Sequence, residues 1–227
     1  MFCVDGFRIE AAAFDMDGLM VDSERVVKLS WKRAGAAMGW DIGDEILLSL
    51  VGRSGPMWRK GMSEAMGSNF PYDEARAERI RLEAAFYSEN PIPIKQGLVQ
   101  LLDFLGNRGI PMAVATSTPR ARVLPILKKA GILDRFEFLF CGDEVEHPKP
   151  EPEMYLRLSA KHGVEAGHCL VLEDSPAGIE AAFRAGTIPV MVPDLVQPDE
   201  ISRGRAARIF GDLGKVLAWL ESGTSLR

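Results

Sequence analysis

The stretch Glu10–Ser23, EAAAFDMDGLMVDS, indicates the fold class of this chain. Its apolar residues 11–14 fit a fully buried strand, although by periodicity alone they could belong to a buried helix. Two carboxylates, Asp15 and Asp17, follow this run, and Gly18 lets the backbone turn sharply. In a parallel sheet, ligands bind at the carboxyl ends of the strands. We therefore expect both aspartates at the mouth of a crevice.

The closeness of these two carboxylates suggests a chemical role. Two like charges so near each other are unfavourable unless positive charge binds them. A carboxylate can attack phosphorus and form an aspartyl phosphate, and a divalent cation with oxygen ligands would neutralise the charge. We interpret Asp15 as a nucleophile and Asp17 as a general acid and base for the leaving and attacking oxygens. The alternative is a pair of solvated turn aspartates.

Composition limits the classes of partner and compartment. The 227 residues suffice for one large domain or for a core with an inserted smaller domain. The net charge of -5 argues against nucleic acid or an anionic membrane as a partner. The three cysteines are too scattered for a disulfide framework, and the three histidines are too dispersed for a zinc site. With neither a signal-peptide pattern nor an apolar run of ~20 residues, we expect a cytoplasmic protein. We also expect a monomer.

A helical pattern follows the DMDG turn. Gly and Pro residues interrupt it at 52–56 and at 67–71. The expected helices cover residues 22–38, 41–50, 56–66 and 72–90. We interpret residues 20–91 as an all-helical insertion, and residues 1–19 together with 92–227 as the core domain.

Helix and strand alternate after the proline-rich segment 90–97. The expected strands are 111–115, 138–141, 169–172, 189–192 and a weaker one at 208–210, with helices at 98–108, 120–130, 152–162, 177–185 and 214–221. Apolar strands at such regular spacing, joined by helical crossovers, predict a parallel sheet covered on both faces. The fold class is therefore α/β.

Polar residues follow two further strands. Thr116 and Ser117 come after strand 111–115, and their hydroxyl and backbone N–H groups could hold the oxygens of a transferring phosphoryl group. The alternative is an ordinary Ser/Thr helix cap. Lys149 lies between two prolines, which would aim its ammonium at the nucleophile and the phosphate. A solvated loop lysine is the alternative there.

A second pair of carboxylates, Glu173 and Asp174, follows strand 169–172. Mg²⁺ takes oxygen ligands and keeps several waters. The carboxylates of Asp15 and Asp174 with the backbone carbonyl of Asp17 would therefore suffice, and Glu173 would lie outside the ligand shell. Capping of the next helix by Asp174 is the alternative. Four strand ends in one chain carry a nucleophile, hydroxyls, a lysine and metal carboxylates. The structural alternatives explain this combination less easily than they explain any one of these groups alone.

These residues resemble, in order, the four motifs of the haloacid dehalogenase-like hydrolase superfamily, most closely its beta-phosphoglucomutase-like phosphatase branch. The motifs are DMDG at 15–18, Thr116 with Ser117, Lys149, and EDSPAG at 173–178, and the match spans nearly the whole chain. The resemblance implies a Rossmann-like core, a mobile helical cap inserted after the first strand, a magnesium ion and an aspartyl phosphate. It also makes Asp15 nucleophile and ligand, Asp17 acid and base, Thr116 a phosphate ligand and Asp174 a magnesium ligand.

The predicted function is Mg²⁺-dependent hydrolysis of a small phosphorylated metabolite: a sugar, polyol or nucleoside phosphate. The resemblance implies that a carboxylate at Asp17 favours phosphate esters over haloacids or phosphonates. Gly18, Thr116 and Ser117 are expected to contact the phosphate. Arg53, the only charged residue of the loop 51–55, is expected to contact the leaving group. Cap residues would set the substrate, which the motifs do not identify.

Two other functions are compatible with the same residues. One is a phosphosugar mutase of the beta-phosphoglucomutase type, and the other is a non-catalytic binding protein that keeps the fold. In the mutases that this sequence resembles, a histidine in the first cap helix links cap closure to acid/base positioning. Here Val27 stands roughly at that place, and the three histidines, His147, His162 and His168, all lie outside residues 20–91. This difference favours hydrolysis.

Overall fold

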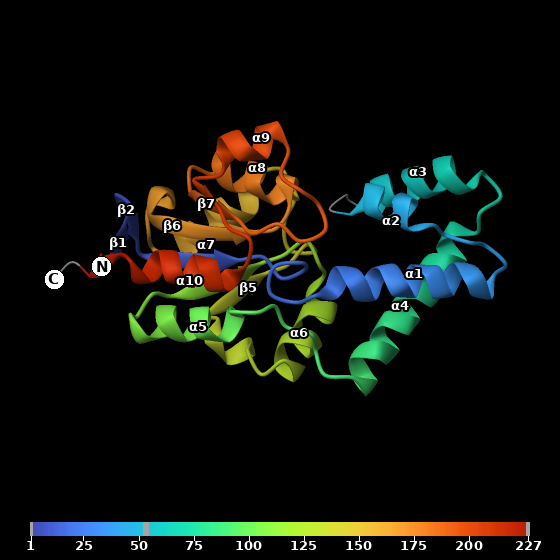
Figure 1. Cartoon of the computed structure of the whole chain (residues 1–227), viewed down its shortest axis with the longest axis horizontal. Helices are drawn as coiled ribbons and strands as arrows, with labels where there is room; N and C mark the ends of the chain where they lie inside the picture. Colours follow the sequence, from blue (N-terminus) through green and yellow to red (C-terminus); the bar gives the residue numbers. More distant parts are fainter. Residues whose placement is uncertain (1, 52–54, 226–227) are drawn as a thin grey trace. The chain divides into compact units, whose positions relative to one another are not determined.

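The structure is a computed structural model that describes residues 2–51 and 55–225. It divides into two compact units, one formed by Met1–Val21 with Pro93–Arg227 and the other by Asp22–Ile92. Figure 1 shows the helices of the second unit in blue to green; the first unit contains the N-terminal strands in dark blue and the later strands and helices in green to red. Within the described ranges, no helix combines the length and the apolar character needed to cross a membrane.

A six-stranded sheet in the order β5-β4-β3-β6-β7-β8 forms the centre of the first unit. Every neighbouring pair in it is parallel. Its strands are β3 (Ala11–Phe14), β4 (Met112–Ala115), β5 (Phe138–Phe140), β6 (Cys169–Glu173), β7 (Ile188–Met191) and β8 (Arg208–Ile209). The predicted α/β class is confirmed. The apolar run after Glu10 is the strand β3 in the interior of this sheet.

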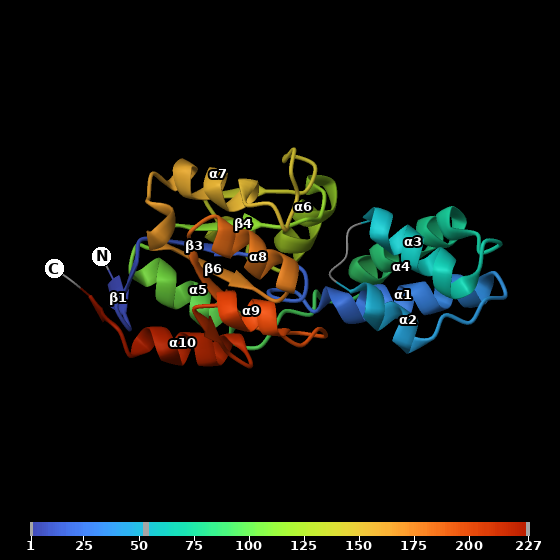
Figure 2. The ribbon, with the colours of Figure 1, turned by 90° about the horizontal axis from the view of Figure 1, so that it is seen from above.

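Helices connect the strands and cover the sheet. They are α5 (Leu98–Asn107), α6 (Arg120–Lys129), α7 (Glu153–His162), α8 (Pro176–Arg184), α9 (Glu200–Arg205) and α10 (Leu213–Glu221), with short 3₁₀ helices at Leu133–Arg135 and Ala166–His168. Figure 2 shows α7 and α10 on opposite sides of the sheet. Helix α9 was not predicted. The Asp199 carboxylate caps it by accepting a hydrogen bond from the Ser202 N–H at 2.7 Å.

Small side chains on the central strands allow α7 and α8 to approach the sheet closely. Ala11 and Ala13 of β3 are fully buried in one cluster with Tyr155 of α7 and Ala181 of α8. Successive residues of a strand point to opposite faces, so Phe14 lies on the other side, where its ring meets the Phe136 ring edge-on. This packing holds the end of β3, and hence Asp15, in a defined position.

A small antiparallel sheet in the order β2-β1-β9 lies near the termini. Its strands are β1 (Phe2–Val4), β2 (Phe7–Ile9) and β9 (Thr224–Ser225). The sequence patterns of residues 2–9 and 224–225 do not predict these strands. Asp5 and Gly6 form the turn between the first two, both with positive φ, as a two-residue hairpin requires. Asp5 accepts hydrogen bonds from Arg208 and Trp219, which attach the hairpin to the rest of this unit.

The second unit contains the helices α1 to α4. They span Ser23–Ala37, Asp44–Leu50, Gly55–Met66 and Tyr72–Glu89. Trp31 of α1 is at the centre of their core, where its ring stacks on Trp58 and also meets Tyr72. The helix expected from residue 41 begins at Asp44, because Ile42 is buried in the core and Gly43 takes an extended N-cap conformation.

Candidate active site

The polar residues that follow β3, β4 and β6 meet at one edge of the sheet. Strand β3 pairs with β4 on one side and with β6 on the other. The chain therefore leaves β3 at a topological switch point, where ligands bind in open α/β sheets. The backbone N–H of Asp15 donates to the Leu172 carbonyl at 3.0 Å, and that of Thr116 donates to the Phe140 carbonyl at 3.0 Å. These bonds extend the sheet pairing into the candidate site.

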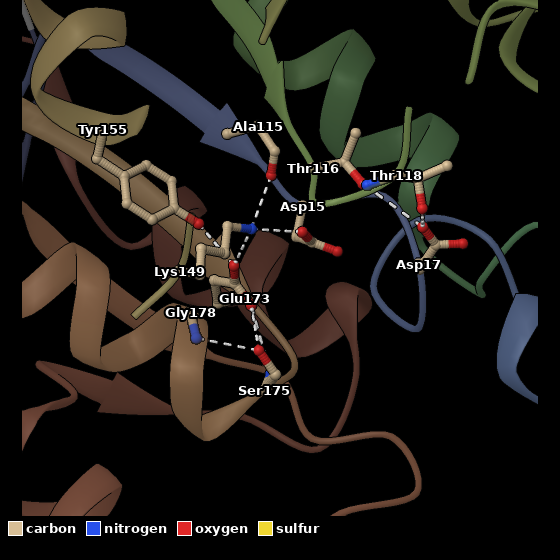
Figure 3. A network of polar contacts seen from close by, with 10 residues as sticks. All are labelled: Asp15, Asp17, Ala115, Thr116, Thr118, Lys149, Tyr155, Glu173, Ser175 and Gly178. Atoms are coloured by element: carbon tan, nitrogen blue, oxygen red, sulfur yellow. Dashed lines mark hydrogen bonds and ion pairs between the residues drawn. The ribbon is translucent and has the colours of Figure 1, made fainter. Parts of the chain in front are cut away.

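Lys149 lies at the centre of a buried polar network. Its ammonium donates to Asp15 Oδ1 at 2.6 Å, to the Ala115 carbonyl at 2.8 Å and to Glu173 Oε1 at 2.5 Å. Figure 3 shows the ammonium between these three oxygens. An ammonium has three donors, and all three are used here. The Lys149 side chain is only 5% exposed, so it is not a solvated loop charge.

Glu173 is held on both of its carboxylate oxygens. In addition to the Lys149 bond, Oε1 accepts a hydrogen bond from the Tyr155 hydroxyl at 2.6 Å. The other oxygen, Oε2, accepts one from the Ser175 hydroxyl at 3.1 Å. A Cβ on Gly178 would lie only 1.9 Å from the carboxylate carbon, so glycine is needed there for close packing. The Glu173 carboxylate thus has a single well-defined orientation.

Burial and charge shift the pKa values of this network. Burial raises the pKa of Asp15 to about 8, against the opposing effect of Lys149, while the charges of Glu173 and Asp17 add to the increase. Burial would lower the pKa of Lys149, but the carboxylates of Asp15 and Glu173 raise it well above its ordinary value. Lys149 therefore stays charged, and further positive charge beside Asp15 would stabilise the ionised form of the Asp15 carboxylate.

The acidic groups fit a divalent cation. Asp15, Glu173 and Asp174 offer carboxylate oxygens that all lie within 4.8 Å of one another. Gly18 has a φ of +80°, and a Cβ there would lie 2.1 Å from Asp174 Oδ2. This glycine allows the turn after β3 to pass directly against the Asp174 carboxylate. Hard oxygen donors in this arrangement suit Mg²⁺. A cation would also favour the ionised form of Asp15.

Asp17 lies apart from the lysine network. Its Oδ2 accepts a hydrogen bond from the Thr118 hydroxyl at 2.6 Å and lies 3.5 Å from the Thr116 hydroxyl, which is a weak contact. The Thr116 hydroxyl itself accepts from the Thr118 N–H at 3.1 Å. Asp17 is half-buried, whereas Asp15 is buried. Figure 3 shows Asp17 directed toward the two threonines.

The remaining predicted site residues divide into those near this network and those elsewhere. Thr116 is buried beside Asp17, and the Ser117 side chain is exposed. Arg53 lies outside the described residues. Sequence reasoning missed Tyr155, because a tyrosine on the apolar face of a helix is normally interpreted as core. Its position shortly after Lys149 was the one available signal.

Several known proteins are similar to this chain in sequence. A family model described as "Hydrolase: haloacid dehalogenase-like hydrolase" matches residues 9–186. The chain is 29% identical over 182 residues to a phosphorylated carbohydrates phosphatase of Thermotoga maritima, covering 78% of this chain and 82% of that protein. It is 32% identical over 179 residues to validoxylamine A 7'-phosphate phosphatase of Streptomyces hygroscopicus subsp. limoneus, with 78% and 82% covered.

A solved structure is also similar. The crystal structure of CbbY from Rhodobacter sphaeroides in complex with phosphate superposes with a TM-score of 0.77 at 26% identity, covering 94% of this chain and 99% of that chain. Because the match covers nearly all of both chains, it includes residues of both units of the present chain.

Proposed function

Because the chain belongs to the haloacid dehalogenase-like hydrolase family, we propose that it is a Mg²⁺-dependent phosphatase that acts through an aspartyl phosphate on Asp15. The observation that carries the proposal is the buried Lys149 ammonium bound to both Asp15 and Glu173. The similar Thermotoga maritima protein is named a phosphatase of phosphorylated carbohydrates. We propose the same substrate class here, a small phosphorylated carbohydrate or a related metabolite.

In the first half of the proposed reaction, a carboxylate oxygen of Asp15 attacks the phosphorus of the ester. The bond between phosphorus and the ester oxygen breaks, and the leaving oxygen takes a proton from Asp17. Lys149 binds Asp15 Oδ1 at 2.6 Å, which leaves Oδ2 as the attacking atom. The positive charge of Lys149 offsets the repulsion between the Asp15 carboxylate and the phosphate.

In the second half, water attacks the phosphorus of the aspartyl phosphate. The water gives a proton to Asp17, the acyl phosphate bond breaks, and inorganic phosphate leaves with the Asp15 carboxylate restored. The Thr116 hydroxyl is suited to bind a phosphoryl oxygen, whereas the Arg120 N–H at the start of α6 already donates to Asp143 Oδ1 at 2.9 Å. We propose no such role for the exposed Ser117 hydroxyl, whose backbone N–H remains a candidate.

The carboxylates of Asp15 and Asp174, with the Asp17 carbonyl, would hold the Mg²⁺ ion. When bound, the ion would supply positive charge that offsets the nucleophile and the phosphate. Both oxygens of Glu173 already accept hydrogen bonds, so we place Glu173 outside the ligand shell. We further propose that the helical unit 22–92 acts as the cap that selects the substrate, with Arg53 as a candidate contact.

The test is hydrolysis of p-nitrophenyl phosphate and of a panel of phosphorylated sugars, polyols and nucleosides. We expect phosphate release that requires Mg²⁺ and stops when EDTA is added. Asp15→Asn should abolish turnover, because an amide cannot form the acyl phosphate. Undiminished turnover after thorough chelation, or near wild-type rates in Asp15→Asn, would refute the proposed route.

A mutase that uses the same aspartyl phosphate is the second candidate. It would have to exclude water while a sugar bisphosphate turned around in the site. No histidine occurs in residues 22–92 to link cap closure with Asp17, and this absence favours hydrolysis. Glucose 1-phosphate with a trace of glucose 1,6-bisphosphate, followed by ³¹P NMR, separates the two. Glucose 6-phosphate that accumulates faster than inorganic phosphate would establish the mutase.

A further inference from the structure

The Tyr155 hydroxyl reaches the site from the interior of the protein. Tyr155 is on α7, is 0% exposed, and donates a hydrogen bond to Glu173 Oε1 at 2.6 Å. The same oxygen accepts a hydrogen bond from the Lys149 ammonium at 2.5 Å. Lys149 lies in the loop that leads into α7, so one continuous segment delivers two donors to one carboxylate oxygen.

We infer that Tyr155 is a positioning residue, whose hydroxyl holds the Glu173 carboxylate in the orientation that keeps the Lys149 ammonium on Asp15. This inference rests on the proposed function and adds a residue to it. Tyr155 does not touch the reacting atoms. It acts on the lysine through Glu173.

Hydrogen-bond capacity is the first reason. A carboxylate oxygen accepts about two hydrogen bonds along its lone pairs, and Glu173 Oε1 receives two, from Lys149 and Tyr155. The Ser175 hydroxyl binds Oε2. Without the tyrosine hydroxyl, a fully buried charged oxygen would lose one partner, which is unfavourable enough to make the carboxylate rotate. Lys149 would then move with it.

The surroundings of Glu173 are the second reason. Close packing against Gly178 blocks movement of the carboxylate toward α8. Asp15 and Asp174 each have a carboxylate oxygen within 4.8 Å of a Glu173 oxygen. Rotation of the Glu173 carboxylate would therefore change its contact with the Lys149 ammonium and its distance from the two neighbouring carboxylates. The hydroxyl of Tyr155 prevents this movement.

The substitution Tyr155→Phe isolates the hydroxyl. The Lys149 ammonium lies 5.3 Å from the centroid of the Tyr155 ring, and a phenylalanine keeps this cation–π contact together with the ring's packing. Tyr72→Phe is the matched control. Tyr72 is also buried, but it belongs to the core of the helical unit.

The kinetic test compares both variants with the wild type on p-nitrophenyl phosphate at saturating Mg²⁺. We expect Tyr155→Phe to lower kcat about tenfold, the effect of one hydrogen bond to a charged group, and to leave KM within about twofold. Tyr72→Phe should keep the wild-type kcat. A merely structural role would lower the unfolding temperature of Tyr155→Phe and leave kcat per folded molecule unchanged, and that result would overturn the inference.

A second readout needs neither substrate nor metal. The ¹H–¹⁵N signal of the buried Lys149 ammonium, assigned by its loss in Lys149→Arg, should shift or broaden in Tyr155→Phe and stay in place in Tyr72→Phe. An unchanged signal in Tyr155→Phe overturns the inference. A wild-type protein that hydrolyses no phosphate ester overturns the proposed function and the role of Tyr155 with it. An unchanged kcat per folded molecule or an unchanged Lys149 signal in Tyr155→Phe would rule out the role of Tyr155 and leave the proposed phosphatase function intact.

Discussion

The two sides of the candidate site hold their carboxylates in different ways. On the lysine side, formed by Lys149, Asp15, Glu173 and Tyr155, every group is buried, and the ammonium binds both acids. On the threonine side, Asp17 is half-buried and accepts its short hydrogen bond from a neutral hydroxyl, that of Thr118. Asp15 and Asp17 therefore differ in their surroundings, although they belong to one turn: Asp15 is buried beside a charged group, and Asp17 is half-buried beside a neutral one.

This difference matches two chemical tasks. A nucleophile that forms a covalent bond must be aimed at one atom, so a rigid set of charged contacts suits Asp15. An acid and base must give a proton to one oxygen and later take one from another, so it needs freedom to adjust. A single hydroxyl partner permits that adjustment at Asp17. The contrast predicts that damage to the lysine side affects folding as well as turnover, whereas damage to the threonine side affects turnover alone.

The largest effect is expected from Lys149→Met. The substitution leaves Asp15 and Glu173 buried without their ammonium, and breaking a buried pair in this way costs about 3–5 kcal/mol of unfolding free energy. Turnover should fall below detection, because Asp15 loses the charge that offsets the phosphate. Urea unfolding measures the stability, and phosphate release from p-nitrophenyl phosphate measures the turnover.

Two variants control this result. Lys95→Met removes a lysine from another ion pair, with Asp194 at 2.7 Å. This ammonium is partly exposed, and it pairs with one buried carboxylate where Lys149 pairs with two, so the unfolding free energy should fall less. Adding Glu173→Gln to Lys149→Met removes one uncompensated buried charge and should recover part of the stability without recovering turnover. A Lys149→Met protein as stable as the wild type would show that the lysine side is not a coupled unit.

Asp17→Asn should have a smaller effect and spare folding. General acid and base catalysis contributes typically 10²–10⁴-fold, so we expect a loss of that order in kcat with unfolding free energy near the wild-type value. The loss should be greater for an alkyl phosphate than for p-nitrophenyl phosphate, because nitrophenolate can leave without a proton. Equal losses for both substrates would contradict the role of Asp17 as the acid.

The sheet and the set of residues at its edge could be predicted because both depend on order along the chain. Buried parallel strands are apolar runs, and their carboxyl ends share one edge, so Asp15, Thr116 and Glu173 had to lie near one another once the strands were recognised. The hairpin at the N-terminus was missed although Asp5-Gly6 is a typical two-residue turn. Its strands have only three residues each, too few for a clear alternating pattern.

The division of the site into two sides could not be predicted. Residue spacing places Asp17 near Asp15, but the direction of its side chain depends on the Thr118 hydroxyl, which reaches it from the segment after β4. Tyr155 shows the same limit. Its helical position predicts burial, yet the partner of its hydroxyl comes from a strand that follows later in the chain. Side-chain partners across elements are decided by three-dimensional packing that one sequence does not display.

The smallest expected effect is that of Thr118→Val, which removes the hydroxyl bonded to Asp17 at 2.6 Å and keeps the side-chain shape. We expect kcat to fall about threefold to tenfold, since a single bond to a half-buried group is lost and water can partly replace it. The loss should again be greater for an alkyl phosphate, because Thr118 would act on the reaction only by orienting the acid. Thr118→Ser keeps a hydroxyl and should recover most of kcat. If Thr118→Val instead lowered the unfolding free energy as Lys149→Met does, the threonine side would be as rigidly built as the lysine side, and the freedom assigned to Asp17 would have to be abandoned.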